Sequence, residues 1–324
     1  MQILSYLPQF REYLSVLLGR RPGTVTRYCR AVESFTEWFG SRGGSGGNAE
    51  PNVRSITRDD IEAWMKHLFL HQGNIKNISR AAKLSALKAF WRFLVYKGVI
   101  KEDPLTLIPS PKVTRPMPQK FSTLQLKQIF SGPDLSTDRG VRDMAILKVL
   151  YASGPRVDEI RSLSVEDLRT SGGDIYLYYH GKGGKERVVR LRRNPSEALR
   201  RWLVVRERYI NSEDPDSARS LFVSMSYNSR GRRLSVQAYN AVLKKYAALV
   251  GIRNERVFTH KMRATFATDL YDMGFGLIEI SNLLGHESVE TTQLYIAISE
   301  KALKKTAIPD KRWRELERKG GEDE

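Results

Sequence analysis

Apolar residues recur at helical spacing through the first hundred residues of the chain. The last such segment carries an apolar stripe of Leu84, Leu87, Trp91 and Leu94 and reaches a stop signal at Gly98. The pattern predicts four helices, over residues 4–20, 24–39, 57–70 and 77–98. Four short helices of this kind are typical of a small all-α domain.

A proline-rich stretch follows these helices. Five prolines between Pro104 and Pro118 prevent a continuous helix and favour an extended connector. Beyond it, β-forming residues at 174–179 and 186–191 flank a glycine-rich turn and predict a β-hairpin. Helices are predicted over residues 123–131, 140–151, 156–163, 196–210, 235–250, 260–273, 277–284 and 289–304. We therefore expect a mainly α protein with a small β-sheet: an all-α domain over residues 1–108, a linker over 109–121, and a mixed α/β domain with a C-terminal tail over 122–324.

The chain is strongly basic, with 54 Lys and Arg against 36 Asp and Glu, a net charge of +18. Both halves of the chain contribute, so both are expected to face one polyanion, for which duplex DNA is the leading candidate. Scattered, solvated surface charge is the alternative. The single cysteine, Cys29, excludes an internal disulfide framework and a multi-cysteine zinc site. The sequence shows neither a membrane-spanning run nor a signal peptide, which predicts a cytoplasmic protein.

Basic side chains cluster near the ends of the predicted N-terminal helices, where a helix start favours phosphate. The candidate DNA-contacting residues are Arg20, Arg21, Arg27, Arg30, Lys76, Arg80 and Lys83. For any one of them, plain solvation is the competing interpretation.

Four stretches of the second domain carry the candidate chemistry. These residues are Arg156 with Glu159, Lys182 in the hairpin turn, His260 with Arg263, and His286 followed nine residues later by Tyr295. The i,i+3 spacing of His260 and Arg263 puts both side chains on one helical face. Each motif alone is weak, because His-x-x-Arg and Gly-Lys-Gly occur often by chance.

In this order and spacing, the four stretches resemble the tyrosine recombinase (phage integrase) family, most nearly its compact Xer-like members. The resemblance covers both domains and implies a helical, SAM-like core-binding domain followed by a catalytic domain. It implies a site-specific DNA recombinase that works as a homo-tetramer on double-stranded DNA, through a Holliday junction, without metal, ATP or other cofactor. Acting on DNA would place the protein at the nucleoid.

The resemblance also assigns roles to single residues. Tyr295 matches the nucleophile, Arg156 and Arg263 the pair that clamps the phosphate, and Lys182 the lysine of the hairpin turn. His260 and His286 match the two histidines around the second arginine, and Glu159 the acid that positions its neighbours. A tyrosyl ester conserves the energy of the phosphodiester, and permanently charged arginines can stabilise the transition state. Lys182 is expected to protonate the leaving 5′-oxygen, with Lys185 as its competitor for that role.

The sequence departs from the family pattern at Pro155, Met262 and Ala264. Pro155 suits a first helical turn and preserves the placement of the arginine after it. Met262 conserves the volume of the usual leucine. Ala264 removes a polar neighbour of Arg263 that many members have, and so affects how that arginine is supported.

Several alternatives stay open at this stage. A type IB topoisomerase has a similar residue set, a DNA-binding accessory protein could share the fold without the chemistry, and a relaxase would need a histidine cluster. In the tail, Leu303, Ala307 and Ile308 could dock into a neighbouring subunit or pack on their own chain. The target site and the biological task, whether dimer resolution, integration or transposition, cannot be read from the residues.

Overall fold

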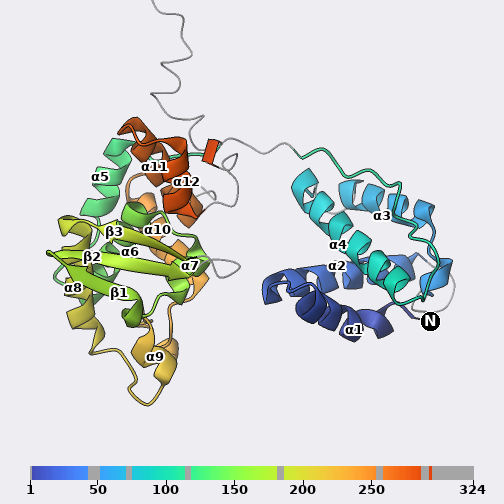
Figure 1. Cartoon of the computed structure of the whole chain (residues 1–324), viewed down its shortest axis with the longest axis horizontal. Helices are drawn as coiled ribbons and strands as arrows, with labels where there is room; N and C mark the ends of the chain where they lie inside the picture. Colours follow the sequence, from blue (N-terminus) through green and yellow to red (C-terminus); the bar gives the residue numbers. More distant parts are fainter. Residues whose placement is uncertain are drawn as a thin grey trace, which may run out of the picture. The chain divides into compact units, whose positions relative to one another are not determined.

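The chain divides into two compact units, Met1–Pro116 and Met117–Glu324, and the division lies inside the proline-rich stretch. The computed structural model describes residues 2–42, 52–70, 75–113, 118–180, 186–252, 258–285 and 292–293. Both units are mainly helical, and the second contains a three-stranded antiparallel sheet, so the predicted fold class is confirmed (Figure 1).

In the described part of the first unit, four α-helices surround an aromatic core. They are α1 (Leu7–Glu12), α2 (Pro22–Ser41), α3 (Arg58–Leu70) and α4 (Asn77–Tyr96). Phe35 contacts Trp64 and Trp91 edge-to-face at centroid distances of 5.5 and 5.7 Å, an arrangement that the ring quadrupoles favour. The four residues of the predicted α4 stripe are fully buried, and Cys29 is buried with them.

The first predicted helix is shorter and less regular than expected. A 3₁₀ turn (Leu4–Tyr6) precedes α1, and a π-helical turn (Tyr13–Leu17) follows it. The chain leaves the helix before Gly19, whose φ of +55° is a left-handed conformation that glycine adopts at little cost. The prediction of one helix over residues 4–20 was therefore wrong in its continuity and its end.

The sheet of the second unit has the order β1-β2-β3, with β1 (Leu168–Ser171), β2 (Asp174–His180) and β3 (Glu186–Leu191). The predicted hairpin strands β2 and β3 pair antiparallel, with Ile175 opposite Leu191 and Tyr179 opposite Arg187. Strand β1 was not predicted. The hairpin turn at residues 181–185 lies outside the described residues.

Eight helices are described in the second unit. They are α5 (Thr123–Ser131), α6 (Asp138–Ser153), α7 (Val157–Ser162), α8 (Arg193–Arg206), α9 (Pro215–Arg219), α10 (Val236–Leu249), α11 (Thr259–Asp272) and α12 (Leu277–Leu284). Helices α6 and α8 pack on each other and both contact β3. The short α9, which was not predicted, lies at the opposite end of the unit from α11 and α12 (Figure 1). The helix predicted over 289–304 falls outside the described residues except for 292–293.

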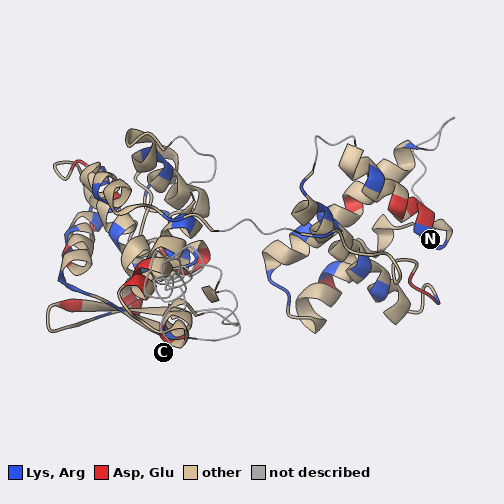
Figure 2. Cartoon of the chain, turned by 90° about the horizontal axis from the view of Figure 1, so that it is seen from above, with Lys and Arg blue, Asp and Glu red and all other residues tan. Residues whose placement is uncertain are grey.

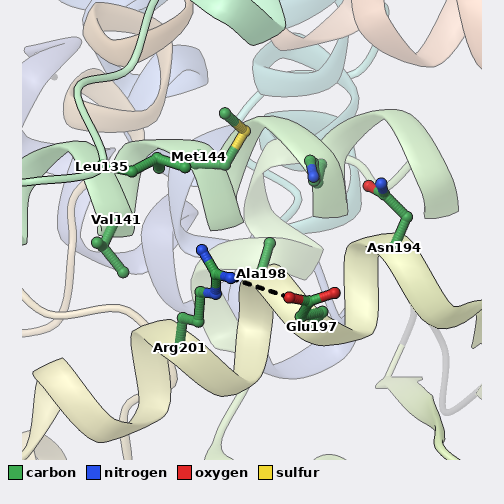
Figure 3. A pocket seen from close by; sticks show the side chains of 8 residues that line it. Leu135, Val141, Met144, Asn194, Glu197, Ala198 and Arg201 are labelled. Atoms are coloured by element: carbon green, nitrogen blue, oxygen red, sulfur yellow. Dashed lines mark hydrogen bonds and ion pairs between the residues drawn. The ribbon is translucent and has the colours of Figure 1, made fainter.

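A small cavity of about 190 Å³ lies where α6 meets α8 (Figure 3). Leu135, Val141 and Met144 supply its apolar side, and an ion pair of 3.0 Å between Glu197 and Arg201 lies on the α8 side. An exposed i,i+4 pair of this kind contributes little to stability. Of the site residues predicted from the sequence, none that lies within the described ranges lines this cavity.

Candidate active site

Two helix ends meet at a buried arginine. Helix α6 is capped by Gly154 with φ +51°, and α12 is capped by Gly285 with φ +62°. Arg263, on α11, is 1% exposed and donates from Nη1 to the Gly154 carbonyl at 2.6 Å and from Nη2 to the Leu284 carbonyl at 2.7 Å. The last carbonyls of a helix lack partners within it and carry negative partial charge, so a guanidinium suits them. Arg263 is thereby fixed by backbone atoms of two helices.

Arg156 and Glu159 form the start of α7. The Arg156 backbone N–H donates to Glu159 Oε2 at 2.9 Å, and its Nη1 forms an ion pair with Glu159 Oε1 at 2.7 Å. Its Nη2 donates to the Gly285 carbonyl at 3.0 Å. Because the Arg156 side chain is still 38% exposed, it is fixed at one edge and open to solvent at another. That placement suits a group that binds an anion.

Arg187, on β3, is a third arginine at the site. Its side chain is 8% exposed, and its Nη2 forms an ion pair with Glu159 Oε2 at 2.9 Å. Nη1 donates to the carbonyls of Leu283 and Ser153, and the guanidinium lies 4.3 Å from the ring centroid of Tyr179.

Sequence reasoning did not assign Arg187 a role, although a signal was present. Residues 187, 189 and 191 share one face of β3, and Val189 and Leu191 on that face are buried. A basic residue on the buried face of a strand requires a partner. That requirement points to a nearby carboxylate, which the structure identifies as Glu159.

The cluster carries excess positive charge. Three guanidinium groups share one carboxylate, with Arg263 Nη1 3.9 Å from Glu159 Oε2. Burial alone would raise the pKa of Glu159, but the charge and hydrogen bond of Arg187, helped by the backbone and side-chain hydrogen bonds of Arg156, outweigh it and lower the pKa below its ordinary value. The carboxylate is therefore ionised near neutral pH, and two positive charges remain for an anion.

His260 stands beside this cluster at the start of α11, on the same helix as Arg263. Partial desolvation of the ring, and then the charges of Arg263 and Arg156, lower the pKa of His260 below its ordinary value of 6.5, although the residue keeps an exposed surface. The imidazole is therefore neutral at pH 7 and can accept a proton or a hydrogen bond.

Four of the seven predicted site residues lie among the described residues, and the structure brings Arg156, Glu159, His260 and Arg263 together. Lys182, His286 and Tyr295 lie outside the described residues. The described part of the chain contains no group of three His, Cys, Asp or Glu side chains that could hold a metal ion. No helix among the described residues is both long and apolar enough to cross a membrane.

The predicted DNA-contacting residues fall into two groups. Five are exposed on or beside α2 and α4: Arg20, Arg21, Arg27, Arg30 and Lys76. Arg80 donates to the Met65 carbonyl at 3.3 Å, and Lys83 to Ser34 Oγ at 3.3 Å, so these two are held within their own unit. Burial lowers the pKa of Lys83. Basic side chains occur on elements of both units (Figure 2).

Comparison with known proteins agrees with this geometry. The Phage integrase family matches residues 119–302, and the phage integrase N-terminal SAM-like domain matches residues 7–98. The chain is 30% identical over 303 residues to tyrosine recombinase XerC of Oceanobacillus iheyensis, covering 94% of each chain. It is 32% identical over 301 residues to tyrosine recombinase XerD of Lacticaseibacillus casei, covering 92% of this chain and 95% of the relative.

Solved structures share the fold. XerH bound to a palindromic difH substrate superposes with a TM-score of 0.69 at 21% identity, over 87% of this chain and 78% of XerH. A lambda integrase dimer bound to a COC′ core site superposes with a TM-score of 0.65 at 17% identity, over 91% of this chain and 95% of the integrase chain. The chain belongs to the phage integrase family, as its sequence resemblance predicted. Its activity is that of a site-specific tyrosine recombinase.

Proposed function

We propose that this recombinase breaks and rejoins double-stranded DNA through a 3′-phosphotyrosyl link to Tyr295. The observation that supports this most is that Arg156 and Arg263 both bond to the end of α12, while Arg263 also bonds to the end of α6. Two fixed guanidinium groups suit the two non-bridging oxygens of a phosphodiester, whose negative charge increases in the transition state. Because the backbone already holds both groups, little reorganisation is needed when the phosphate binds.

The proposed cleavage step needs no cofactor, because every bond broken and every proton moved has a partner in the protein or the DNA. The Tyr295 oxygen attacks phosphorus, the bond to the 5′-oxygen breaks, and Lys182 donates a proton to that leaving oxygen. Neutral His260 accepts the tyrosine proton, and His286 donates to a non-bridging oxygen. A 5′-hydroxyl from a second strand then attacks the phosphotyrosine and restores a phosphodiester. Two such exchanges pass through a Holliday junction.

A covalent adduct tests the proposal. The protein is incubated, without added metal, with a nicked suicide duplex carrying its target, and the products are separated on a denaturing gel. Tyr295→Phe should abolish the adduct and leave duplex binding intact. The control Tyr227→Phe alters a tyrosine that is 98% exposed and should change neither. An adduct that survives Tyr295→Phe refutes the nucleophile, and no adduct from the wild-type protein favours a binding-only role.

A plasmid with two target sites separates recombination from relaxation. A recombinase should give deletion or inversion products that depend on both sites. A type IB topoisomerase would relax the plasmid with no site at all, and that result alone would replace the proposed function.

The active assembly that we propose is a homo-tetramer on DNA at the nucleoid, with the tail docked in trans. An apolar cavity of about 500 Å³ between α5, α6, α8 and α11 supports a docking site in the second unit. Phe130, Tyr151, Phe266 and Leu270 line it, and Met273 at its edge is 70% exposed. These side chains suit an aliphatic plug such as Leu303.

A mixing experiment distinguishes docking in trans from packing on the same chain. Leu303→Asp disables the proposed plug, and Met273→Asp disables the proposed acceptor. Each variant alone should lose cooperative binding of two protomers to a full site. A mixture of the two variants should restore part of that cooperativity, because a wild-type tail can still meet a wild-type cavity. If the mixture restores nothing, docking in trans is refuted.

A further inference from the structure

The carboxylate of Glu159 is shared among three arginines at unequal distances. Its Oε1 pairs with Arg156 Nη1 at 2.7 Å. Its Oε2 accepts from the Arg156 backbone at 2.9 Å and from Arg187 Nη2 at 2.9 Å, whereas Arg263 Nη1 lies 3.9 Å away. The Arg263 contact is beyond hydrogen-bond distance. Arg187 therefore bonds directly to the carboxylate oxygen that lies 3.9 Å from Arg263.

The Arg187 side chain is itself held in place by several contacts. Its Nη1 bonds to the Leu283 and Ser153 carbonyls, and its guanidinium stacks on the Tyr179 ring. A Cβ on Gly285 would lie 3.1 Å from Arg187 Cδ, so the turn that ends α12 also packs on this side chain. The planar guanidinium of arginine can donate to the carboxylate and to a carbonyl at the same time. A lysine ammonium cannot make both contacts with the same geometry.

The placement of Arg187 is not optimised for stability alone. Its Nε is buried and has no hydrogen-bond partner in the structure, which is unfavourable. A buried ion pair can often be replaced by apolar side chains without loss of stability. A role in the chemistry accounts for an arginine at this position better than packing does.

We propose that Arg187 is a positioning residue that keeps the Glu159 carboxylate away from Arg263, so that the charge of the arginine pair stays available to the scissile phosphate. The proposal rests on the proposed function, because it assumes that Arg156 and Arg263 bind that phosphate. Without Arg187, Oε2 loses its side-chain partner, and Arg263 Nη1 is a cationic donor only 3.9 Å away. If the Glu159 carboxylate moved to pair directly with Arg263, its negative charge would offset the positive charge that must stabilise the transition state.

The test measures the single-turnover rate of adduct formation on the suicide duplex, together with duplex affinity. Arg187→Gln should slow adduct formation at least thirtyfold and change duplex affinity less than threefold, since misplaced stabilising groups cost about 10²-fold in rate. The control Arg190→Gln removes an exposed arginine from the opposite face of β3, where it pairs with Asp174. It should leave the rate within threefold of wild type.

A double variant separates charge diversion from a structural role. If Arg187 acts by holding the carboxylate, removing the negative charge of Glu159 should relieve its loss. Arg187→Gln combined with Glu159→Gln should therefore form adduct at least tenfold faster than Arg187→Gln alone. A purely structural role predicts that the second substitution adds to the damage. Recovery below tenfold, or a loss below thirtyfold in the single variant, overturns the proposal.

Folding is checked for each variant by its melting temperature. If Arg187→Gln does not fold, Arg187→Lys takes its place with the same Glu159→Gln partner and the same tenfold recovery criterion. An Arg187→Lys protein that cleaves at the wild-type rate also overturns the proposal. The wild-type and Tyr295→Phe proteins are measured in parallel. No wild-type adduct means that the proposed function fails, whereas a normal wild-type adduct with no recovery in the double variant means that only the role of Arg187 fails.

Discussion

Gly154→Ala should destabilise the second unit, because the position lacks both conformational freedom and space for a side chain. Its φ of +51° is left-handed, which costs a residue with a Cβ roughly 1–2 kcal/mol. The new Cβ would lie 2.4 Å from Phe266 Cδ1 and 3.1 Å from Leu284 Cδ2. Both side chains are buried, and overpacking of this kind costs about 1–3 kcal/mol. The combined loss is therefore about 2–5 kcal/mol.

Gly172→Ala is the matched control. Gly172 has φ +56° but no atom within 4 Å of an added Cβ, so this substitution imposes the backbone strain without the clash. The two variants should therefore differ by the packing cost alone. For a unit of this size that difference lowers the melting temperature of Gly154→Ala by roughly 2–12 °C more than that of Gly172→Ala.

Calorimetry of the full chain measures this difference, with the transition of the second unit followed separately. Adduct formation provides a second measurement, because the Gly154 carbonyl accepts from Arg263 and a shifted carbonyl would misplace that guanidinium. We expect Gly154→Ala to cleave more slowly than Gly172→Ala even well below both melting temperatures. Equal melting temperatures in the two variants would refute the packing argument.

Two further outcomes follow from charge. Because the pKa of His260 lies below 6.5, the imidazole is a neutral base at pH 7. The rate of adduct formation should therefore fall only as the pH drops below 6.5. In a pH series from 5 to 8, a midpoint above 6.5 would contradict the proposed role. If Arg27 and Arg30 contact phosphates, Arg27→Gln and Arg30→Gln should each reduce the slope of log affinity against log salt by about 0.9, equally for target and unrelated duplexes. An unchanged slope would mean that the substituted arginine makes no phosphate contact.

Helices with a strong apolar period could be predicted from the sequence. The stripe of Leu84, Leu87, Trp91 and Leu94 is buried as predicted, and α4 ends two residues before Gly98. Strand β1 could not be found in this way, because its four residues are mostly exposed and show no alternation. It forms because β2 offers an edge to pair with, which is a tertiary effect. Helix α9, with five residues, is too short to show a period.

The site residues that occupy motif positions could be predicted from the sequence. Arg156 and Glu159 pair at i,i+3 as their spacing indicated, and His260 and Arg263 share a helix. The supporting contacts were not predictable, because they are made to backbone carbonyls, which have no sequence signature. Arg187 illustrates the limit: its partners come from α6, α7 and α12, which are far apart along the chain.

The arginine cluster and helix α12 depend on each other. An eight-residue helix is unstable alone, and α12 is attached through a small apolar cluster in which Ile280 and Leu284 pack on Phe266 and Ala267 of α11. Its last two residues, Leu283 and Leu284, and the capping Gly285 each give a carbonyl to a different arginine, so the cluster satisfies the groups that the helix end leaves unpaired. In turn, detaching α12 would take a carbonyl from all three arginines at once. The competence of the site to bind phosphate is therefore coupled to the docking of α12, and a substitution in that small cluster should impair cleavage without any contact with the phosphate.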